Sequence, residues 1–258
     1  MLGAVMAHHP QLLALHEALP HLNVEAFARW KGDMPVSRIE KSIRSKRDTP
    51  IRAADLNGLV YVESSHYCSH LIPELYTLYD ARFIFLHRDG REFTRSGLER
   101  GRWYKDDTQP TSLKRALKEY AARWLRRNHL INIGHHFDDH RLIPPKQYES
   151  RIEKIAWLWT EINQTILQGL DRIPEQDVMT LSLRSFDASL LRSIFDFIGV
   201  ESSDDLISSA MDTARDRPNK TSSRSVPPFE SWELEDRRRF WSIAGPLMGT
   251  LGYEVKQP

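Results

Sequence analysis

The sequence contains very little cysteine. Cys68 is the only cysteine among 258 residues, so the chain cannot form an internal disulfide bond. Disulfide bonds are typical of secreted proteins and rare in reducing compartments. We therefore expect a cytoplasmic location.

An excess of charge of either sign is also absent. The 36 Lys and Arg residues almost balance the 35 Asp and Glu residues, which leaves a formal net charge of +1. Proteins that bind nucleic acid or anionic membrane surfaces usually carry a clear basic excess. We expect neither as a partner, and any anion must be bound by a local group of cations.

Long apolar runs are missing as well. No segment of the sequence approaches the roughly 18 apolar residues of a membrane span. The N-terminal stretch MLGAVMAHHPQLLALHE has no basic region before its apolar residues, and His8, His9 and Pro10 interrupt them, which argues against a signal peptide. With 40% hydrophobic residues, the chain can bury a sizeable core, and we expect one soluble domain over residues 1–258.

Apolar patterning in the first half of the chain predicts two strands joined by a helix. Leu59–Val62 and Arg82–His87 are short and apolar, and residues 66–79 between them carry apolar side chains at helical spacing. Asp89, followed three residues later by Glu92, predicts a capped helix after the second strand. This βαβα order is typical of a parallel sheet.

The second half of the chain is predicted to be mostly helical. Periodicity and turn residues predict helices at 113–128, 148–170, 188–198 and 233–251, and a strand at 178–183. The predicted fold class is α/β and rich in helix, with helices on both faces of a small parallel sheet.

The stretch RFIFLHRDGREFTRSGLERGRWY changes abruptly from an apolar strand to a cationic turn. Ligands of open parallel sheets bind at the carboxyl ends of the strands. There the N-terminus of the next helix attracts anions, and the Arg88 guanidinium suits a phosphate. Ser96, two helical turns later, adds a hydroxyl group. One interpretation is an anion site at Arg88 and Ser96; the other is an ion pair of Arg88 with a nearby acid and an exposed Ser96.

The same stretch resembles the 3′-phosphate-binding motif of the sulfotransferases that use 3′-phosphoadenosine 5′-phosphosulfate (PAPS). In that motif a strand ends in Arg-Asp-Pro/Gly-Arg, and a serine follows eight residues after the first arginine, at the positions of Arg88 and Ser96 here. Three further segments resemble other parts of the family: YVESSHYCSHLIPELYTLYDARF, LSLRSFDASLLRSIFDFIGV and AGPLMGTLGY. The resemblance implies a single sulfotransferase domain with a fold like that of P-loop nucleotide hydrolases.

The resemblance also implies a reaction. A sulfuryl group would pass from PAPS to a hydroxyl or amine of a small-molecule, glycan or lipid acceptor, leaving adenosine 3′,5′-bisphosphate, with no catalytic metal. Arg88 and Ser96 would bind the 3′-phosphate. A catalytically dead relative that binds nucleotide or a partner is the alternative. A small-molecule kinase would need the motif G-x-x-x-x-G-K-[ST], which does not occur in this sequence.

Glu63 is the predicted catalytic base, because branches of the family that this chain resembles carry a glutamate at this position. It follows the predicted strand Leu59–Val62 and would accept the proton of the acceptor. His66 is the alternative base, since imidazole titrates near neutral pH and many cytosolic relatives use a histidine. Glu63 in the stretch ESSH can also serve as a helix cap.

Two other groups of residues leave alternatives open. The stretch HHFDDH at residues 135–140 contains five potential metal ligands, but it has no partner motif such as HExxH, and we interpret it as a polar loop. Lys220 and Arg224 lie in a basic loop before the last predicted helix. They suit either a contact with the cofactor or a solvated surface.

The N-terminus departs from the family pattern. In the family a first strand leads into a loop resembling PRSGTTWL, which grips the 5′-phosphosulfate, whereas MLGAVMAHHP resembles the segment after that loop. The resemblance therefore predicts a shortened form that lacks the loop and a central strand and has little or no sulfotransferase activity.

Overall fold

The computed structural model describes residues 2–100, 104, 142, 144–215 and 225–254. The predicted helix at 113–128 lies outside these residues. The described elements are α1 (Leu2–Met6), β1 (Leu12–His16), α2 (Asn23–Lys31), α3 (Val36–Leu56), β2 (Val60–Ser64), η1 (His66–His70), α4 (Ile72–Tyr79), β3 (Phe83–His87), α5 (Gly90–Arg100), α7 (Arg151–Leu170), η2 (Glu175–Asp177), β4 (Val178–Ser182), η3 (Leu183–Ser185), α8 (Ala188–Ile198), α9 (Asp204–Arg215), η4 (Phe229–Ser231) and α10 (Leu234–Thr250), where η marks a short 3₁₀ helix.

The four described strands form two parallel pairs. β1 pairs with β2, in a register that sets His16 opposite Ser64 at the carboxyl ends of the strands. β3 pairs with β4, and His87 lies opposite Ser182 at the corresponding ends. The chain is therefore α/β and rich in helix, with small parallel sheets, as the sequence predicts.

The connectivity of the strands differs from the prediction. The sequence predicts β2 and β3 in one parallel sheet, but within the described part of the chain they belong to separate pairs. β1 was not predicted at all. Its sequence LLALH is a continuous apolar run, and such a run lacks the alternation that distinguishes a strand from a buried helix.

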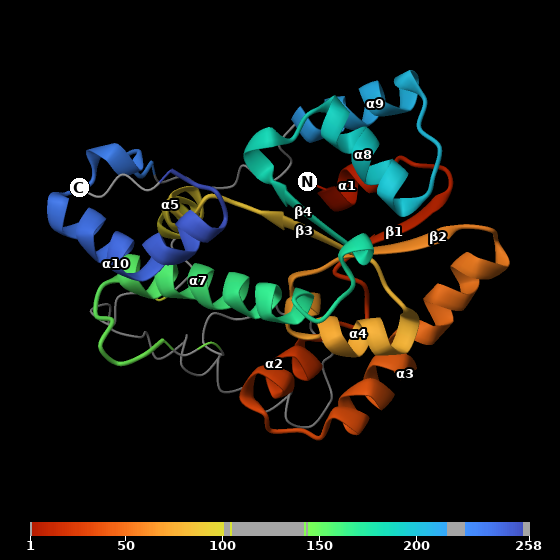
Figure 1. Ribbon diagram of the computed structural model, residues 1–258, viewed down its shortest axis with the longest axis horizontal. Helices are drawn as coiled ribbons and strands as arrows, with labels where there is room; N and C mark the ends of the chain where they lie inside the picture. The colour runs from red at the N-terminus through yellow and green to blue at the C-terminus, as the bar shows by residue number, and fades with distance from the viewer. Residues whose placement is uncertain (1, 101–103, 105–141, 143, 216–224, 255–258) are drawn as a thin grey trace, which may run out of the picture.

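A shared apolar layer holds the two strand pairs together. The helices α1, α8 and α9 lie on one side of the strands, and α2, α3 and α4 lie on the other (Figure 1). Residues of α1, β1, α8 and α9 form one apolar cluster. Side chains from all four described strands pack against it, among them Ala14, Val62, Ile84 and Met179. Burial of this common layer joins the pairs without a continuous hydrogen-bonded ladder.

Local capping explains where two of the helices begin and end. The Asp187 carboxylate accepts a hydrogen bond from the Leu190 amide at the start of α8, and Gly199 ends the helix in the left-handed conformation. The bounds of α8 are those that the sequence predicts, 188–198. α7 begins with a capping box, in which Ser150 and Glu153 each accept a hydrogen bond from the other's backbone amide.

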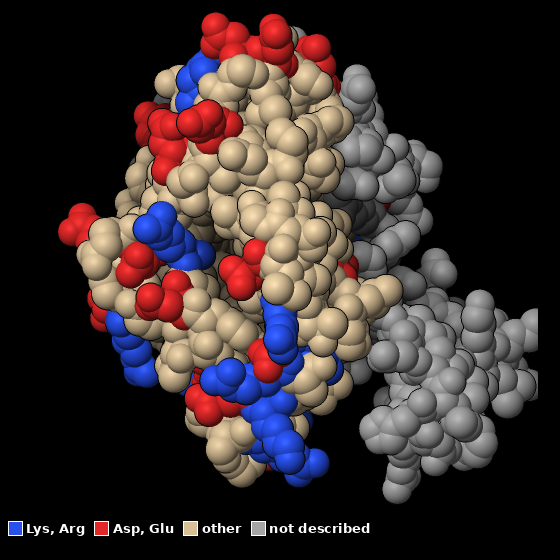
Figure 2. Space-filling model, turned by 90° about the vertical axis from the view of Figure 1, so that its right-hand side faces the viewer, with Lys and Arg blue, Asp and Glu red and all other residues tan. Residues whose placement is uncertain are grey.

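The face of the molecule in Figure 2 carries acidic side chains at its top, where α9 lies, and basic side chains at its lower end, where α3 lies. The exposed charged residues of these two helices include Asp204, Asp205 and Asp212 in α9 and Arg38, Lys41, Arg44 and Arg52 in α3, which also exposes Asp48 and Asp55. Between the two ends, acidic and basic side chains are interspersed (Figure 2), so the described residues of this face form no continuous basic track of the kind that follows a nucleic-acid backbone.

Within the described ranges, no helix combines the length and the apolar character that a transmembrane helix requires.

The turn after β3 packs tightly on the core formed by α7 and α10. The Trp159 side chain is 1% exposed in this core, and its indole Nε1 donates a hydrogen bond to the Arg88 carbonyl at 2.9 Å. Gly90 lies so close that an added Cβ atom would be 3.1 Å from Met248 Sδ and 3.1 Å from Trp159 Cδ2. The first residue of α5 must therefore be small.

We expect Gly90→Ala to lower the free energy of unfolding by about 1–3 kcal/mol, because the new methyl group overpacks this contact. The matched control is Gly245→Ala in the interior of α10, where an added Cβ atom would be 3.4 Å from Trp241, an ordinary contact. There the gain in helix propensity, about 1 kcal/mol, is offset by the contact of the new Cβ atom with the ring of Pro246, the next residue of α10, so stability should change little. Chemical denaturation measures both, and equal effects of the two substitutions would contradict the prediction.

Candidate functional site

A buried carboxylate ties together the carboxyl ends of β3 and β4. The Asp89 side chain accepts hydrogen bonds from the Arg91 amide at 2.9 Å and from the Arg91 guanidinium at 2.7 and 3.0 Å. It also forms an ion pair with Arg184 at 2.8 Å, just after β4. Because Asp89 is 2% exposed, this network fixes the position of the turn that carries Arg88.

Arg91 and Arg184 keep the Asp89 carboxylate charged. Burial by itself raises the pKa of a carboxyl group. The hydrogen bonds from Arg91 and the positive charges of both arginines outweigh that effect and hold the pKa of Asp89 below its ordinary value. The negative charge of Asp89 is thus neutralised inside the network.

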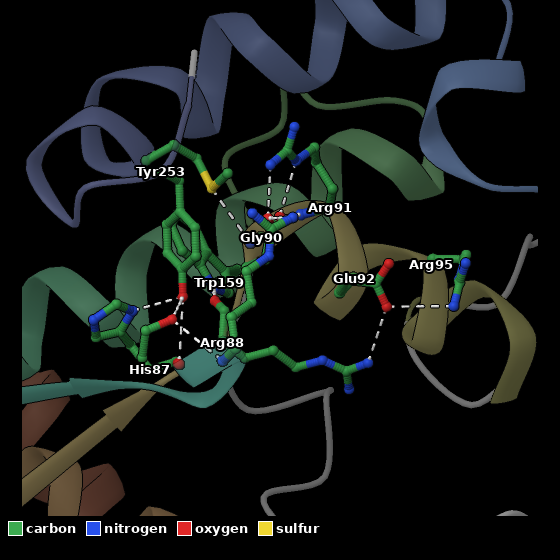
Figure 3. Close-up of polar contacts among 12 residues, drawn as sticks. His87, Arg88, Gly90, Arg91, Glu92, Arg95, Trp159 and Tyr253 are labelled. Carbon is green, nitrogen blue, oxygen red and sulfur yellow. Dashed lines mark hydrogen bonds and ion pairs between the residues drawn. The ribbon is translucent and has the colours of Figure 1, made fainter. Parts of the chain in front are cut away.

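The Arg88 guanidinium lies at the surface. Its side chain is 41% exposed and extends away from Trp159 and Tyr253 toward Glu92 (Figure 3). Arg88 Nη2 lies 3.4 Å from Glu92 Oε2, and Arg95 Nη2 lies 3.3 Å from the same oxygen. Two guanidinium groups therefore hold one carboxylate oxygen between them.

Ser96 lies on the same side of α5 as Glu92. It follows Glu92 by four residues, which is about one helical turn, and it is partly buried. The ion pair between Arg88 and Glu92 is the alternative that the sequence left open. Since an ion pair between exposed side chains contributes at most about 1 kcal/mol, another anion can displace Glu92 at low cost.

The interpretation of the sequence did not include Arg95 and Arg184. Arg95 precedes Ser96 directly, and its place on the helix face was available from the sequence. Arg184 is 95 residues from Asp89 along the chain, and only the pairing of β3 with β4 brings them together. Together with Arg88 these residues make the carboxyl ends of β3 and β4 cationic.

Glu63 occupies a different environment from the one predicted for a base. Its carboxylate accepts hydrogen bonds from Arg47 Nε at 2.6 Å, from Arg47 Nη2 at 2.9 Å and from the Tyr61 hydroxyl at 2.9 Å. Arg47 comes from α3 and is 2% exposed. The same guanidinium donates to the backbone carbonyls of Ala18 and Pro20 at 3.1 and 2.8 Å.

This ion pair changes the interpretation of Glu63. A carboxylate that must accept a proton would first have to release a buried guanidinium, which is strongly unfavourable. The negative charge of Glu63 also affects its neighbours, since burial and this charge together raise the pKa of Tyr61 and raise that of Cys68 to about 12. The alternative of a helix cap is wrong, because Ser65 caps η1 by accepting from the Tyr67 amide.

His66, the alternative base, lies at the carboxyl ends of β1 and β2. Its Nδ1 atom is 2.9 Å from Glu17 Oε1, and its side chain is 36% exposed. It is the first residue of η1, which Ser65 caps. Its imidazole therefore combines access to the surface with a carboxylate neighbour.

Several residues considered from the sequence lie outside the described ranges. These are the potential metal ligands at 135–140 and the basic residues Lys220 and Arg224. Within the described ranges, no three His, Cys, Asp or Glu side chains are grouped so that they can hold a metal ion.

Comparisons with known proteins give no family for this chain: no family model matches it, and no curated protein matches it. The functional assignment therefore depends on the geometry of these residues and on the resemblance of the stretch around Arg88 and Ser96.

We expect Glu63→Ala to lower the free energy of unfolding by about 3–5 kcal/mol, because it leaves the Arg47 charge buried without its partner. The control is Glu161→Ala, which removes one hydrogen bond from Trp30 Nε1 and should cost no more than about 1.5 kcal/mol. The double substitution Arg47→Met with Glu63→Leu should recover much of the loss, since it removes both charges. Urea denaturation that gives Glu63→Ala and Glu161→Ala equal stabilities would show that Glu63 has no such structural role.

Proposed function

We propose that this chain is a PAPS-dependent sulfotransferase whose Arg88 and Ser96 bind the 3′-phosphate of the nucleotide. One observation carries the proposal: an exposed guanidinium at the carboxyl end of a parallel strand, on a fixed backbone, with Arg95 beside it. This is the position at which α/β proteins bind ligands. The resemblance of the sequence motif supplies the identity of the anion.

The positive charges of Arg88 and Arg95 suit a phosphate better than the Glu92 carboxylate that they contact in this structure. Glu92 contributes one oxygen to both guanidinium groups, at 3.4 and 3.3 Å. A phosphate monoester carries a charge of about −1.5 to −2 and three acceptor oxygens, so it can bind Arg88, Arg95 and the Ser96 hydroxyl together. We infer that the 3′-phosphate replaces Glu92 between the two arginines.

The proposed reaction transfers the sulfuryl group to a hydroxyl or amine of the acceptor. The bond from sulfur to the acceptor forms, the bond from sulfur to the phosphate oxygen breaks, and the acceptor proton passes to a base. Glu63 was the base predicted from the sequence. The ion pair between Arg47 and Glu63 favours His66 instead, because the His66 side chain is partly exposed and Glu63 is bound to a buried partner.

A catalytically dead relative that binds nucleotide is the second candidate function. The ion pair between Arg47 and Glu63 favours this alternative, because it withdraws from proton transfer the base that the sequence predicted. Measurement of nucleotide binding followed by turnover with PAPS separates the two. A cytoplasmic location is part of the proposal in either case, because the single thiol of Cys68 has no partner cysteine.

Arg88→Ala should weaken the binding of adenosine 3′,5′-bisphosphate by roughly tenfold to more than a hundredfold, because a charge-assisted hydrogen bond contributes about 1.5–3 kcal/mol. Binding of adenosine 5′-monophosphate, which has no 3′-phosphate, should barely change. Isothermal titration calorimetry measures both affinities. Arg192→Ala is the control, since its side chain is similarly exposed, 40% against 41%, and pairs with Asp204 elsewhere. Equal weakening of both nucleotides, or of neither, would contradict the assignment.

Glu92→Gln should strengthen the binding of adenosine 3′,5′-bisphosphate by about twofold to fivefold, because it removes a carboxylate that competes for Arg88 and Arg95. Glu235→Gln is the control, because its carboxylate pairs with Arg239 in α10, 3.2 Å from Arg239 Nε, and not with Arg88 or Arg95. The gain should shrink at high salt concentration. Unchanged or weaker binding by Glu92→Gln at low salt would show that Glu92 does not occupy the phosphate position.

A further inference from the structure

Glu17 adopts an unusual backbone conformation at the carboxyl end of β1. Its φ angle is 48°, in the left-handed region that residues with a Cβ atom rarely enter. Its amide donates a hydrogen bond to the Ser64 carbonyl at 3.0 Å, which continues the pairing of β1 with β2. The side chain turns toward η1, where Oε1 lies 2.9 Å from His66 Nδ1. Strained conformations of this kind persist where the surroundings hold them, often at functional sites.

The surroundings of Glu17 are held by the buried ion pair. The next residue, Ala18, has its carbonyl bound by Arg47 Nη2, and the Pro20 carbonyl is bound by Arg47 Nη1. Glu63 in turn fixes the orientation of this guanidinium. A continuous series of contacts therefore runs from Glu63 through Arg47 to the loop that carries Glu17.

The imidazole at the other end of this series is accessible. The His66 side chain is 36% exposed, whereas that of Glu17 is 17% exposed. A pair that only joined η1 to the loop after β1 would need no such access. A carboxylate that binds Nδ1 of an exposed imidazole selects the tautomer with the proton on Nδ1, and this tautomer presents the Nε2 lone pair as a base.

We propose that Glu17 is a positioning residue that holds His66 in the form of a general base. The inference rests on the proposed function and extends it. During transfer the acceptor O–H or N–H bond breaks and its proton joins His66 Nε2, while the electron pair of the broken sulfur–oxygen bond leaves with the phosphate. The Glu17 carboxylate stabilises the imidazolium that forms. Glu63 acts at a distance, by fixing Arg47 and with it the loop.

The first arm of the test does not depend on activity. Nitrogen-15 NMR of the imidazole nitrogens at alkaline pH should show the Nδ1–H tautomer for His66 in the full chain. Glu17→Ala should convert it to a mixture of tautomers, while Glu17→Gln, whose amide oxygen still accepts from Nδ1–H, should retain most of it. Asp48→Ala, which removes a carboxylate bound to Tyr79, is the control and should leave His66 unchanged. Circular dichroism confirms that each variant is folded.

The second arm measures turnover with PAPS. Glu17→Ala should lower kcat by at least about 10-fold, because the imidazole loses the carboxylate that sets its tautomer and stabilises the imidazolium. KM for PAPS should stay near the wild-type value, and Glu17→Gln should restore part of the rate. His66→Ala should lower kcat at least as much, and adding Glu17→Ala to it should cost little more, because the two act as a unit.

Two results would overturn the inference: an Nε2–H tautomer for His66 in the wild-type chain, or a Glu17→Ala variant whose kcat matches that of Asp48→Ala. If the wild-type chain transfers no sulfuryl group to any acceptor, the proposed function fails, and the NMR arm alone decides the role of Glu17. A tautomer that Glu17→Ala disturbs then supports positioning, and one that it leaves unchanged refutes it.

Discussion

The first half of the structure depends on the buried ion pair between Arg47 and Glu63. One guanidinium from α3 binds both oxygens of a carboxylate on β2 and two carbonyl oxygens of the loop after β1. Burial lowers the pKa of a guanidinium, but the hydrogen bonds and charge of Glu63 outweigh this and raise the pKa of Arg47. A charge removed from water in this way is stable only when its partners are complete. A single side chain therefore links α3 to β2 and to the loop after β1.

The second half uses the same device at the end of the other strand pair. Asp89 is almost fully buried and neutralised by Arg91 and Arg184. These ion pairs fix the turn after β3 and tie it to the end of β4. In both halves the buried charges are paired, and the more exposed groups beside them lie at the carboxyl ends of the strands. These exposed groups are His66 in one half and Arg88 in the other. This division separates residues that hold the fold from residues that can meet a ligand.

The same division affects the two kinds of predicted site residue differently. Arg88 stays a proposed phosphate ligand, because its backbone is held by Trp159 while its side chain is 41% exposed. Glu63 loses its advantage as a base, because it is 9% exposed and bound by Arg47. Burial is what distinguishes a carboxylate that can exchange protons from one that stabilises a neighbouring charge.

The sequence by itself determined the features that depend on near neighbours. The helix predicted at 188–198 has the bounds of α8, and the turn after β3 follows from the change at Arg88 from apolar to cationic residues. Only the tertiary structure decided which distant groups meet: Arg47 with Glu63 across 16 residues, Glu17 with His66 across 49, and β3 with β4. The physical reason is one of range. Caps and periodicity involve residues within a turn or two of each other, whereas the partner of a buried charge is chosen by the packing of whole helices against strands.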